Sequence, residues 1–252
     1  MKKNKILIII FAVIFLISAI FLVIHLIPEK NDFDKYKNDT SEVESVASKE
    51  EEIILPDNPI DFAKLEKQND EIIGWLNIPD TIIDYPILQS GIDTKEDFYL
   101  DKDINKKYKS AGSLYIQKMN YDDFSDPNTI IYGHNMLNGT MFGTLKRFRN
   151  SGYFNNHDTM YVYIPGHILT YRIYSAFIYD DRHILNSFEF YNKESYEKFL
   201  SETLDPVSMT RNVRKGVEVT TEDKIITLST CISRATERYL VLGVLINDQP
   251  TK

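Results

Sequence analysis

The chain has 252 residues, of which 43% are hydrophobic and 12% aromatic, and its formal net charge at pH 7 is -8. This length suits one sizeable globular core or at most two domains. The negative balance argues against nucleic acid as a partner, because phosphate binding needs a basic face. The chain contains 16 tyrosines and 14 phenylalanines in many short runs, which favours a β-rich fold.

The chain begins with a basic head at residues 1–5, followed by an apolar run at residues 6–27. Only Ser18 and His25 interrupt this run, and as a helix it would be about 33 Å long, enough to cross a hydrocarbon core of about 30 Å. Lysines before the run and acids after it predict a transmembrane signal anchor, with the N-terminus in the cytoplasm and the body outside the cell. The alternative is a cleaved signal peptide, whose apolar region is usually shorter.

Residues 28–57 form an acidic segment, with ten acidic residues against four lysines from Glu29 onward. Such a composition cannot bury enough apolar surface to fold alone. The segment is therefore predicted to be a disordered linker that holds the following domain away from the membrane.

A folded domain is predicted over residues 58–252. Phe62, Leu65 and Ile72 fall at helical spacing, and Asp57 or Asn58 could cap this first helix. Runs rich in β-branched and aromatic residues then predict strands at 75–78, 82–88, 111–116, 129–132, 159–164, 168–178, 217–220, 224–230 and 239–246. Short helices are predicted around 141–148 and 196–204. Many short strands with a few peripheral helices favour a β-barrel.

The only cysteine, Cys231, ends one predicted strand, and Arg238 stands at the start of the next. A rigid strand end that presents a thiol beside a fixed cation is a sensible way to build a catalytic site. An unpaired cysteine in an exported chain invites oxidation or mispairing, so its presence indicates that the thiol is needed. The alternative is an inert cysteine buried in the core.

A cysteine nucleophile needs a base or a cation, because a free thiol with a pKa of about 8.5 is only a few per cent thiolate at neutral pH. His134 directly follows a predicted strand and Gly133, so its side chain can point into a cleft. The other histidines lie in the apolar run, a polar loop, a hairpin turn and a solvated charge cluster, respectively: His25, His157, His167 and His183. Cys231 and His134 are thus predicted to be two reactive groups presented by two strand ends.

The sequence YGHN at residues 132–135, TLSTC at 227–231 and the arginine at 238 together resemble the sortase family. Further features resemble class B of that family: a helix leading into GWL at 74–76, YPILQ at 85–89, DFYL at 97–100 and a helical insertion around 193–204. The resemblance covers residues 60–252. It implies a mainly β fold, a closed barrel of seven to eight strands with an N-terminal helix and the helical insertion before the cysteine strand, preceded by one transmembrane helix.

The resemblance implies a cysteine transpeptidase at the surface of a Gram-positive cell. Cys231 would attack a carbonyl in the C-terminal sorting motif of a secreted protein and form a thioester, which an amine of the peptidoglycan cross-bridge would resolve. His134 would act as general acid and then as general base, and Arg238 would stabilise the oxyanion or hold the substrate backbone. Implied substrate-binding residues are Leu100, Ser229 and Thr230. The loop at residues 182–183 would also shape the groove, although the sequence there departs from the family pattern.

No metal or other cofactor is expected, because one cysteine and scattered histidines offer no ligand spacing. Two alternatives stay open. The chain could be another cell-wall Cys-His peptidase, in which the thiol often opens a helix, or a non-enzymatic anchored domain that binds a surface ligand. The reactivity of Cys231 toward a thiol probe separates an accessible nucleophile from a core residue.

Overall fold

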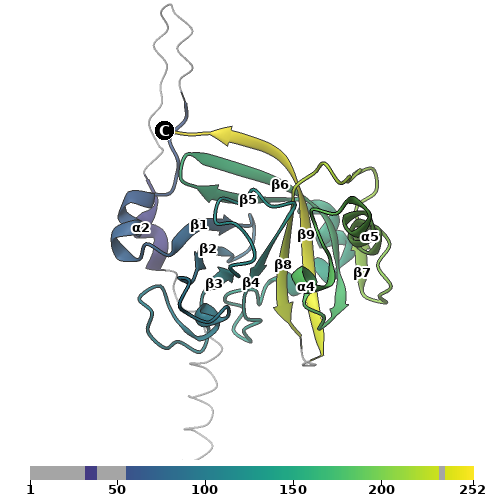
Figure 1. Cartoon of the computed structure of the whole chain (residues 1–252), viewed down its shortest axis with the longest axis horizontal. Coiled ribbons are helices and arrows are strands. Elements are labelled where there is room, and N and C mark those ends of the chain that lie inside the picture. The colour runs from purple at the N-terminus through teal and green to yellow at the C-terminus, as the bar shows by residue number, and fades with distance from the viewer. Residues whose placement is uncertain (1–31, 39–54, 233–235) are drawn as a thin grey trace, which may run out of the picture.

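The computed structural model describes residues 32–38, 55–232 and 236–252 (Figure 1). Within these ranges the strands are β1 (Ile72–Asn77), β2 (Asp84–Gln89), β3 (Leu114–Ile116), β4 (Asn128–Tyr132), β5 (Thr159–Ile164), β6 (His167–Asp180), β7 (Arg211–Val213), β8 (Ile225–Cys231) and β9 (Glu237–Pro250). The helices are η1 (Asp32–Tyr36), α2 (Phe62–Gln68), η2 (Phe98–Asp101), η3 (Leu145–Arg149), α3 (Ser151–Asn156), α4 (Ile184–Ser187) and α5 (Lys193–Leu204).

Eight of the described strands close into a barrel in the order β5-β1-β2-β3-β4-β8-β9-β6, and β6 pairs with β5 to complete the ring. β7 pairs with β6 outside the ring. Most neighbours are antiparallel, but β2–β3 and β4–β8 are parallel. The predicted closed barrel of seven to eight strands is therefore confirmed, and the hairpin predicted between residues 159 and 178 is formed by β5 and β6.

Three apolar clusters stabilise the barrel. The first fills its interior and includes Leu76, Ile87 and Val241. The second lies between the barrel and α5, whose Tyr196 and Phe199 are buried there. The third lies on the opposite side of the molecule, where α2 covers the barrel in Figure 1. Because β8 is covered on both faces, six consecutive residues of it are buried and only its last residue is exposed.

The helical insertion predicted before the cysteine strand is confirmed as α5. Its N-terminus is capped by the side chain of Asn192, which accepts a hydrogen bond from the backbone N–H of Ser195 at 3.0 Å. Asn192 thus satisfies one of the amide groups that a helix N-terminus leaves unpaired. The apolar face of the amphipathic helix α5 packs on the barrel beside β8 and β9 (Figure 1).

Two local predictions differ from the structure. The first helix begins after Asp61, whose side chain caps Lys64 N at 2.9 Å, and not after Asp57 or Asn58; Ile72 belongs to β1 rather than to this helix. Residues 217–220 form no strand, and the short β7 lies earlier in the chain. Ile72 belongs to a strand because it pairs with β2, and β7 forms where the chain pairs with β6. Local propensity does not report pairing between strands.

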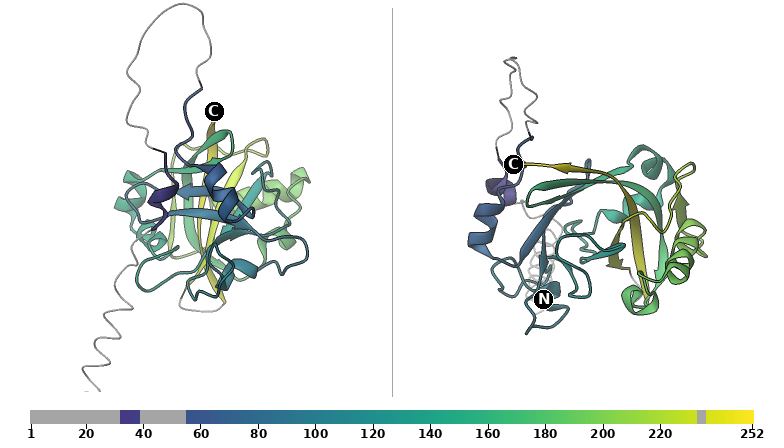
Figure 2. Two further views of the ribbon diagram at one scale, coloured as in Figure 1. Left: turned by 90° about the vertical axis from the view of Figure 1, so that its left-hand side faces the viewer. Right: turned by 45° about the horizontal axis from the view of Figure 1, so that its top comes forward.

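Part of the segment assigned to the acidic linker folds onto the barrel. η1 buries Tyr36 to 2% exposure, and Phe33 packs edge-on against Trp75 with ring centroids 5.7 Å apart. Lys37 forms an isolated β-bridge with Ile60. The two aromatic rings carry enough apolar surface to dock a short stretch of an otherwise polar segment. The C-terminus lies on the same side, where Lys252 N donates to Pro56 O at 3.0 Å (Figure 2).

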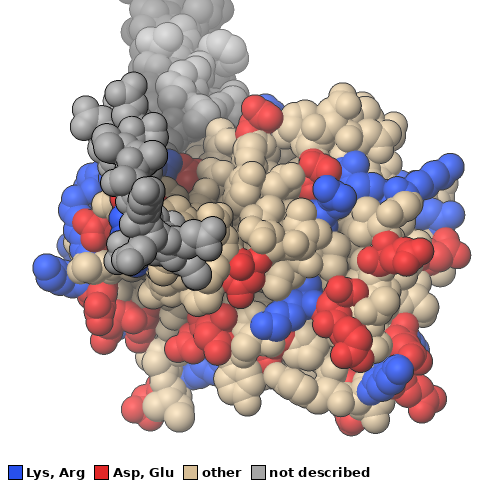
Figure 3. Space-filling model, turned by 90° about the horizontal axis from the view of Figure 1, so that it is seen from above, with Lys and Arg blue, Asp and Glu red and all other residues tan. Residues whose placement is uncertain are grey.

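The apolar run at residues 6–27 lies outside the described residues. No helix within the described ranges has the length and the apolar character needed to cross a membrane. On the face drawn in Figure 3, acidic and basic side chains are interspersed around a largely uncharged central area.

Candidate active site

Cys231 emerges at the rim of the barrel. Its strand, β8, lies between parallel β4 and antiparallel β9, so its backbone is hydrogen-bonded on both sides. The thiol is exposed and belongs to no disulfide. The strand β8 is thus buried up to its last residue, Cys231, and the hydrogen bonds of the sheet fix where that exposed residue lies.

Arg238 lies directly opposite Cys231 in the β8–β9 ladder and opposite Tyr179 in the β9–β6 ladder. Its backbone is therefore held from both sides, as expected for a residue at the start of an internal strand. Its Nη1 donates to Glu237 O at 3.2 Å. Arg234, in the loop that joins the two strands, lies outside the described residues.

The end of β4 is held against β8. Gly133 N donates to Ser229 O at 3.2 Å, and the hydroxyl of Thr230 donates to Gly133 O at 2.6 Å. A Cβ atom on Gly133 would lie 2.5 Å from Leu114 Cδ2, so a larger residue there would require the side chain of Leu114 to move. Because parallel strands end at the same edge of a sheet, His134 and Cys231 reach the same rim.

The imidazole of His134 has a defined partner. Its Nε2 lies 2.9 Å from the carbonyl oxygen of Leu100, a residue of η2. A carbonyl can only accept a hydrogen bond, so Nε2 carries the proton in this contact and Nδ1 is the unprotonated nitrogen of the neutral ring. The backbone carbonyl of His134 also accepts from Phe142 N at 2.9 Å, which closes the loop that follows β4.

The six site residues predicted from the sequence line one cavity of about 270 Å³: Leu100, His134, Ser229, Thr230, Cys231 and Arg238. Leu100 is 36% exposed, whereas Ser229 and Thr230 are almost fully buried. A larger cavity of about 450 Å³ lies between η1 and residues 103–114 and includes none of these six. The smaller cavity is the candidate active site because it contains the thiol, the imidazole and the guanidinium together.

Two stacked tyrosine rings form part of this cavity. Tyr115 and Tyr132 have ring centroids 5.5 Å apart and an interplanar angle of 26°. Burial raises the pKa of both hydroxyls well above the ordinary value, and the positive charge of Arg238 acts in the opposite direction on each. Both phenols are therefore neutral at physiological pH, and the field of the guanidinium extends across the cavity.

The local residue pattern placed His183 in a solvated charge cluster, whereas the family resemblance placed its loop beside the groove, where the structure has it. The side chain is half-buried in the structure, lines the cavity and places Nε2 2.7 Å from Gln117 Oε1. Its neighbour Arg182 does belong to a surface charge cluster, paired with Asp180 at 2.8 Å. The contact of His183 joins residues 66 positions apart, so no local pattern could have predicted it.

The two other described histidines lie away from the cavity. His157 stacks on Tyr153 with ring centroids 3.8 Å apart, and His167 pairs with Asp248 at 2.7 Å. Both fit the structural roles expected of them. Within the described ranges, no group of three or more histidine, cysteine or acidic side chains is arranged to hold a metal ion.

A model of the sortase domain matches residues 76–246 of the chain. Sortase B of Listeria monocytogenes is 36% identical over 170 residues, which is 66% of this chain and 65% of that protein, slightly under two thirds of its length. Sortase B of Staphylococcus aureus is 29% identical over 94% of both chains. The X-ray structure of Clostridium perfringens sortase B superposes with a TM-score of 0.66 at 32% identity, covering 74% of this chain and 100% of that one.

The chain therefore belongs to the sortase family. The relatives and the matching structure are all class B members, so within the family the chain falls in class B, as the sequence motifs indicated.

Proposed function

We propose that this chain is a cell-surface cysteine transpeptidase that cleaves the C-terminal sorting motif of secreted proteins. The acyl part of the substrate would be transferred through a Cys231 thioester to an amine of the peptidoglycan cross-bridge. The observation that supports this is one exposed thiol sharing a cavity with an imidazole and a guanidinium, in a chain of the sortase B class. Water in place of the amine would give peptidase activity.

In the first half-reaction, the sulfur of Cys231 as thiolate attacks the scissile carbonyl carbon, and the carbonyl oxygen becomes an oxyanion. Arg238 stabilises this negative charge from a backbone already held by two strands, so little reorganisation is needed during the reaction. Protonated His134 gives its proton to the departing amide nitrogen. The C–N bond breaks, and the thioester forms.

In the second half-reaction, the acceptor amine attacks the thioester carbonyl. His134, now neutral, takes a proton from the amine nitrogen, and the tetrahedral intermediate collapses with release of the Cys231 thiolate. The new amide bond leaves the enzyme in its starting protonation state. The same residue thus acts as acid in one half-reaction and as base in the other.

Substrate contacts are assigned to Leu100, Ser229 and Thr230. Leu100 is the exposed apolar member and offers a wall for an apolar side chain of the sorting motif. Ser229 and Thr230 lie in the floor. Because the Thr230 hydroxyl already donates to Gly133 O, its contribution would come from packing rather than from a new hydrogen bond.

We assign residues 58–252 to the catalytic domain and residues 6–27 to a single membrane anchor that leaves residues 1–5 in the cytoplasm. The basic head and the long apolar run support this orientation. The catalytic domain would then face the cell wall, where both substrates are found.

The test is incubation of the detergent-solubilised full chain with a library of sorting pentapeptides, followed by intact-mass detection of the adduct. A thioester on Cys231 that disappears when a small primary amine is added supports the proposal. No adduct from any peptide, with rapid labelling of Cys231 by a thiol probe, would favour another Cys-His peptidase. A thiol that does not react with the probe would favour a binding domain.

A further inference from the structure

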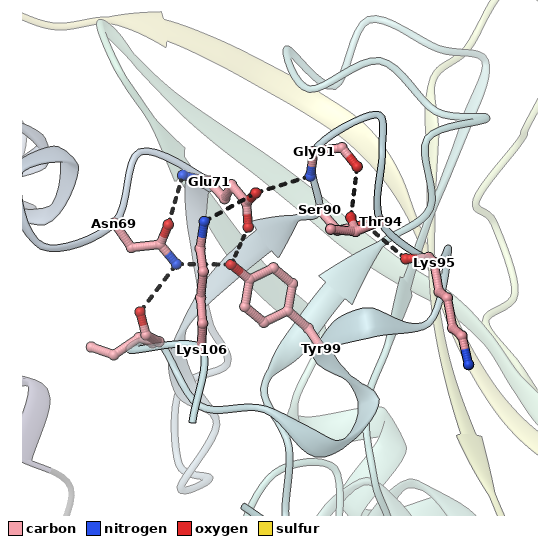
Figure 4. Close-up of polar contacts among 9 residues, drawn as sticks. Asn69, Glu71, Ser90, Gly91, Thr94, Lys95, Tyr99 and Lys106 are labelled. Atoms are coloured by element: carbon pink, nitrogen blue, oxygen red, sulfur yellow. Dashed lines mark hydrogen bonds and ion pairs between the residues drawn. The ribbon is translucent and has the colours of Figure 1, made fainter. Parts of the chain in front are cut away.

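The carbonyl that binds His134 belongs to a segment held by a polar cluster, the Tyr99 cluster, which consists of the buried Asn69 and Tyr99, the partly buried Glu71 and the exposed Lys106 (Figure 4). Tyr99 is the residue next to Leu100 in η2, and its side chain is fully buried. The Tyr99 side chain thus anchors the chain one residue before the carbonyl that contacts His134.

The Tyr99 cluster joins three segments that are far apart in the sequence. The Tyr99 hydroxyl donates to Glu71 Oε2 and accepts from Asn69 Nδ2 at 2.8 Å. Asn69 Nδ2 also donates to Ile104 O at 3.0 Å, which fixes the loop after η2. Glu71 Oε1 accepts from the backbone N–H of Gly91 at 3.0 Å and lies 3.1 Å from Lys106 Nζ. Through these contacts the cluster shown in Figure 4 joins η2 and the loop after it to the connection between α2 and β1 and to the turn after β2.

Gly112 contributes from the other side of η2. It adopts φ of +58°, and a Cβ atom there would overlap the carbonyl of Leu100 and approach Tyr99 O to 2.7 Å. Ser113 N donates to Tyr99 O at 3.0 Å, so the strand that follows Gly112 also binds η2. The carbonyl of Leu100 therefore lies between two supports. One is the Tyr99 cluster, and the other is the backbone at Gly112, which comes so close only because glycine has no Cβ atom.

We propose that Tyr99, Glu71 and Gly112 are positioning residues for the acid–base histidine. They hold the carbonyl of Leu100 where it accepts a hydrogen bond from His134 Nε2. That bond keeps the neutral ring in the Nε2–H tautomer, so Nδ1 is the nitrogen that gives and takes the proton in both half-reactions. This inference rests on the proposed function for its catalytic consequence, but the tautomer itself can be measured without any substrate.

The physical reason is that free neutral imidazole populates both tautomers, and a single well-placed acceptor shifts the balance between them. If the carbonyl moves, the ring can rotate or exchange tautomers, and the fraction with Nδ1 available falls. The thiol, Arg238 and the substrate floor are held by β8 and β9 and would be unaffected. Leu100, which we assign to the substrate wall, would move with its carbonyl, so the effect that identifies a positioning role is the change of tautomer, which is measured without substrate.

The test compares Tyr99→Phe with Tyr196→Phe in the full-length protein labelled with ¹⁵N-histidine. Both substitutions delete a hydroxyl that makes two hydrogen bonds, but the Tyr196 hydroxyl holds Pro127 O and Asp223 O, near the starts of β4 and β8 and away from the rim. At a pH high enough for the His134 ring to be neutral, the ¹⁵N shifts of His134 in the wild type and in Tyr196→Phe should report the Nε2–H form. In Tyr99→Phe they should move toward a mixture of the two tautomers.

The rate of single-turnover acylation at saturating peptide should fall about 10-fold in Tyr99→Phe and by less than about 2-fold in Tyr196→Phe. Gly112→Ala should give the same shift of the His134 ¹⁵N signals and a larger loss of rate. Wild-type ¹⁵N shifts of His134 in both Tyr99→Phe and Gly112→Ala would overturn the inference. If the tautomer shifts as expected but no thioester forms in the wild type, the positioning role stands and the proposed function fails.

Discussion

The two walls of the candidate active site are built in different ways. Cys231 and Arg238 face each other across β8 and β9, and backbone hydrogen bonds of the ladder place both. His134 lies beyond the end of β4, and its ring is oriented by the carbonyl of Leu100 in a separate segment. The first wall, the cysteine wall, depends on sheet register, whereas the second, the histidine wall, depends on particular side chains and glycines.

This difference indicates where each wall tolerates change. A ladder is formed by main-chain groups, so most substitutions on the cysteine wall leave the geometry intact and remove only the chemistry of the side chain. The histidine wall involves, besides His134 itself, the close backbone contact at Gly112 and, by the inference above, the Tyr99 hydroxyl. Substitutions remote from the thiol can therefore impair it. The following predictions test this comparison, from the largest expected effect to the smallest.

Replacing Cys231 with Ala should abolish thioester formation completely while leaving the fold unchanged, because it removes one exposed sulfur from a strand end that the ladder holds. Intact mass spectrometry after incubation with a sorting peptide measures the first effect, and thermal unfolding measures the second. A variant that still transferred the acyl group would place the nucleophile elsewhere.

His134→Ala should reduce single-turnover acylation by about 10²–10⁴-fold, because the leaving amine loses its proton donor. The matched control is His157→Ala, which removes a ring stacked on Tyr153 outside the cavity and should leave the rate near that of the wild type. Near-normal turnover by His134→Ala, together with a severe defect in His157→Ala or His183→Ala, would show that the base had been assigned to the wrong residue.

Arg238→Ala should slow acylation by about 10²–10³-fold, the usual cost of one preorganised oxyanion donor. Lysine should rescue poorly, because a point ammonium lacks the planar fork of the guanidinium. Arg234→Ala, in the connecting loop, should stay within a few-fold of the wild type. The measurement is the single-turnover rate of Cys231 acylation in the three variants, and the reverse ranking of the two arginines would contradict the role of the β9 backbone.

The smallest effect concerns stability on the histidine wall. Burial tends to raise the pKa of Glu71, but hydrogen bonds from Tyr99, the Gly91 amide and Lys106 outweigh it and leave the pKa below its ordinary value. A depressed folded-state pKa stabilises the protein above the unfolded-state pKa, about 4.3 for Glu, and this stabilisation is lost as the pH falls through the folded-state value.

Glu71→Gln should therefore lower the free energy of unfolding near pH 7, and its difference from the wild type should shrink at acidic pH. Urea unfolding of both proteins at several pH values measures this. A difference that stays constant across the acidic range would mean that the ionised carboxylate is not what holds the Tyr99 cluster.

Much of the fold was predictable from local patterns. Runs of β-branched residues bounded by turn residues located most strands of the barrel, and the only cysteine and His134 were each found at the end of such a run. The juxtaposition of Cys231, His134 and Arg238 could be predicted because strand ends gather at the rim of a barrel. Their catalytic roles stay predictions, as does the membrane anchor at residues 6–27.

The sequence by itself thus determined most of the strands and the reactive groups at their ends, because these depend on residue types that are near one another in the chain, and the resemblance of its motifs to sortases supplied the closed barrel and the family. Only the tertiary structure decided which partner orients each group. The partner of His134 is the backbone carbonyl of Leu100, and because every residue has such a carbonyl, the sequence does not mark this one. The contact joins residues 34 positions apart. The docking of η1 and the pairing of His183 with Gln117 are similar cases. Such contacts depend on how distant segments pack, and the local periodicity of a sequence does not predict that packing.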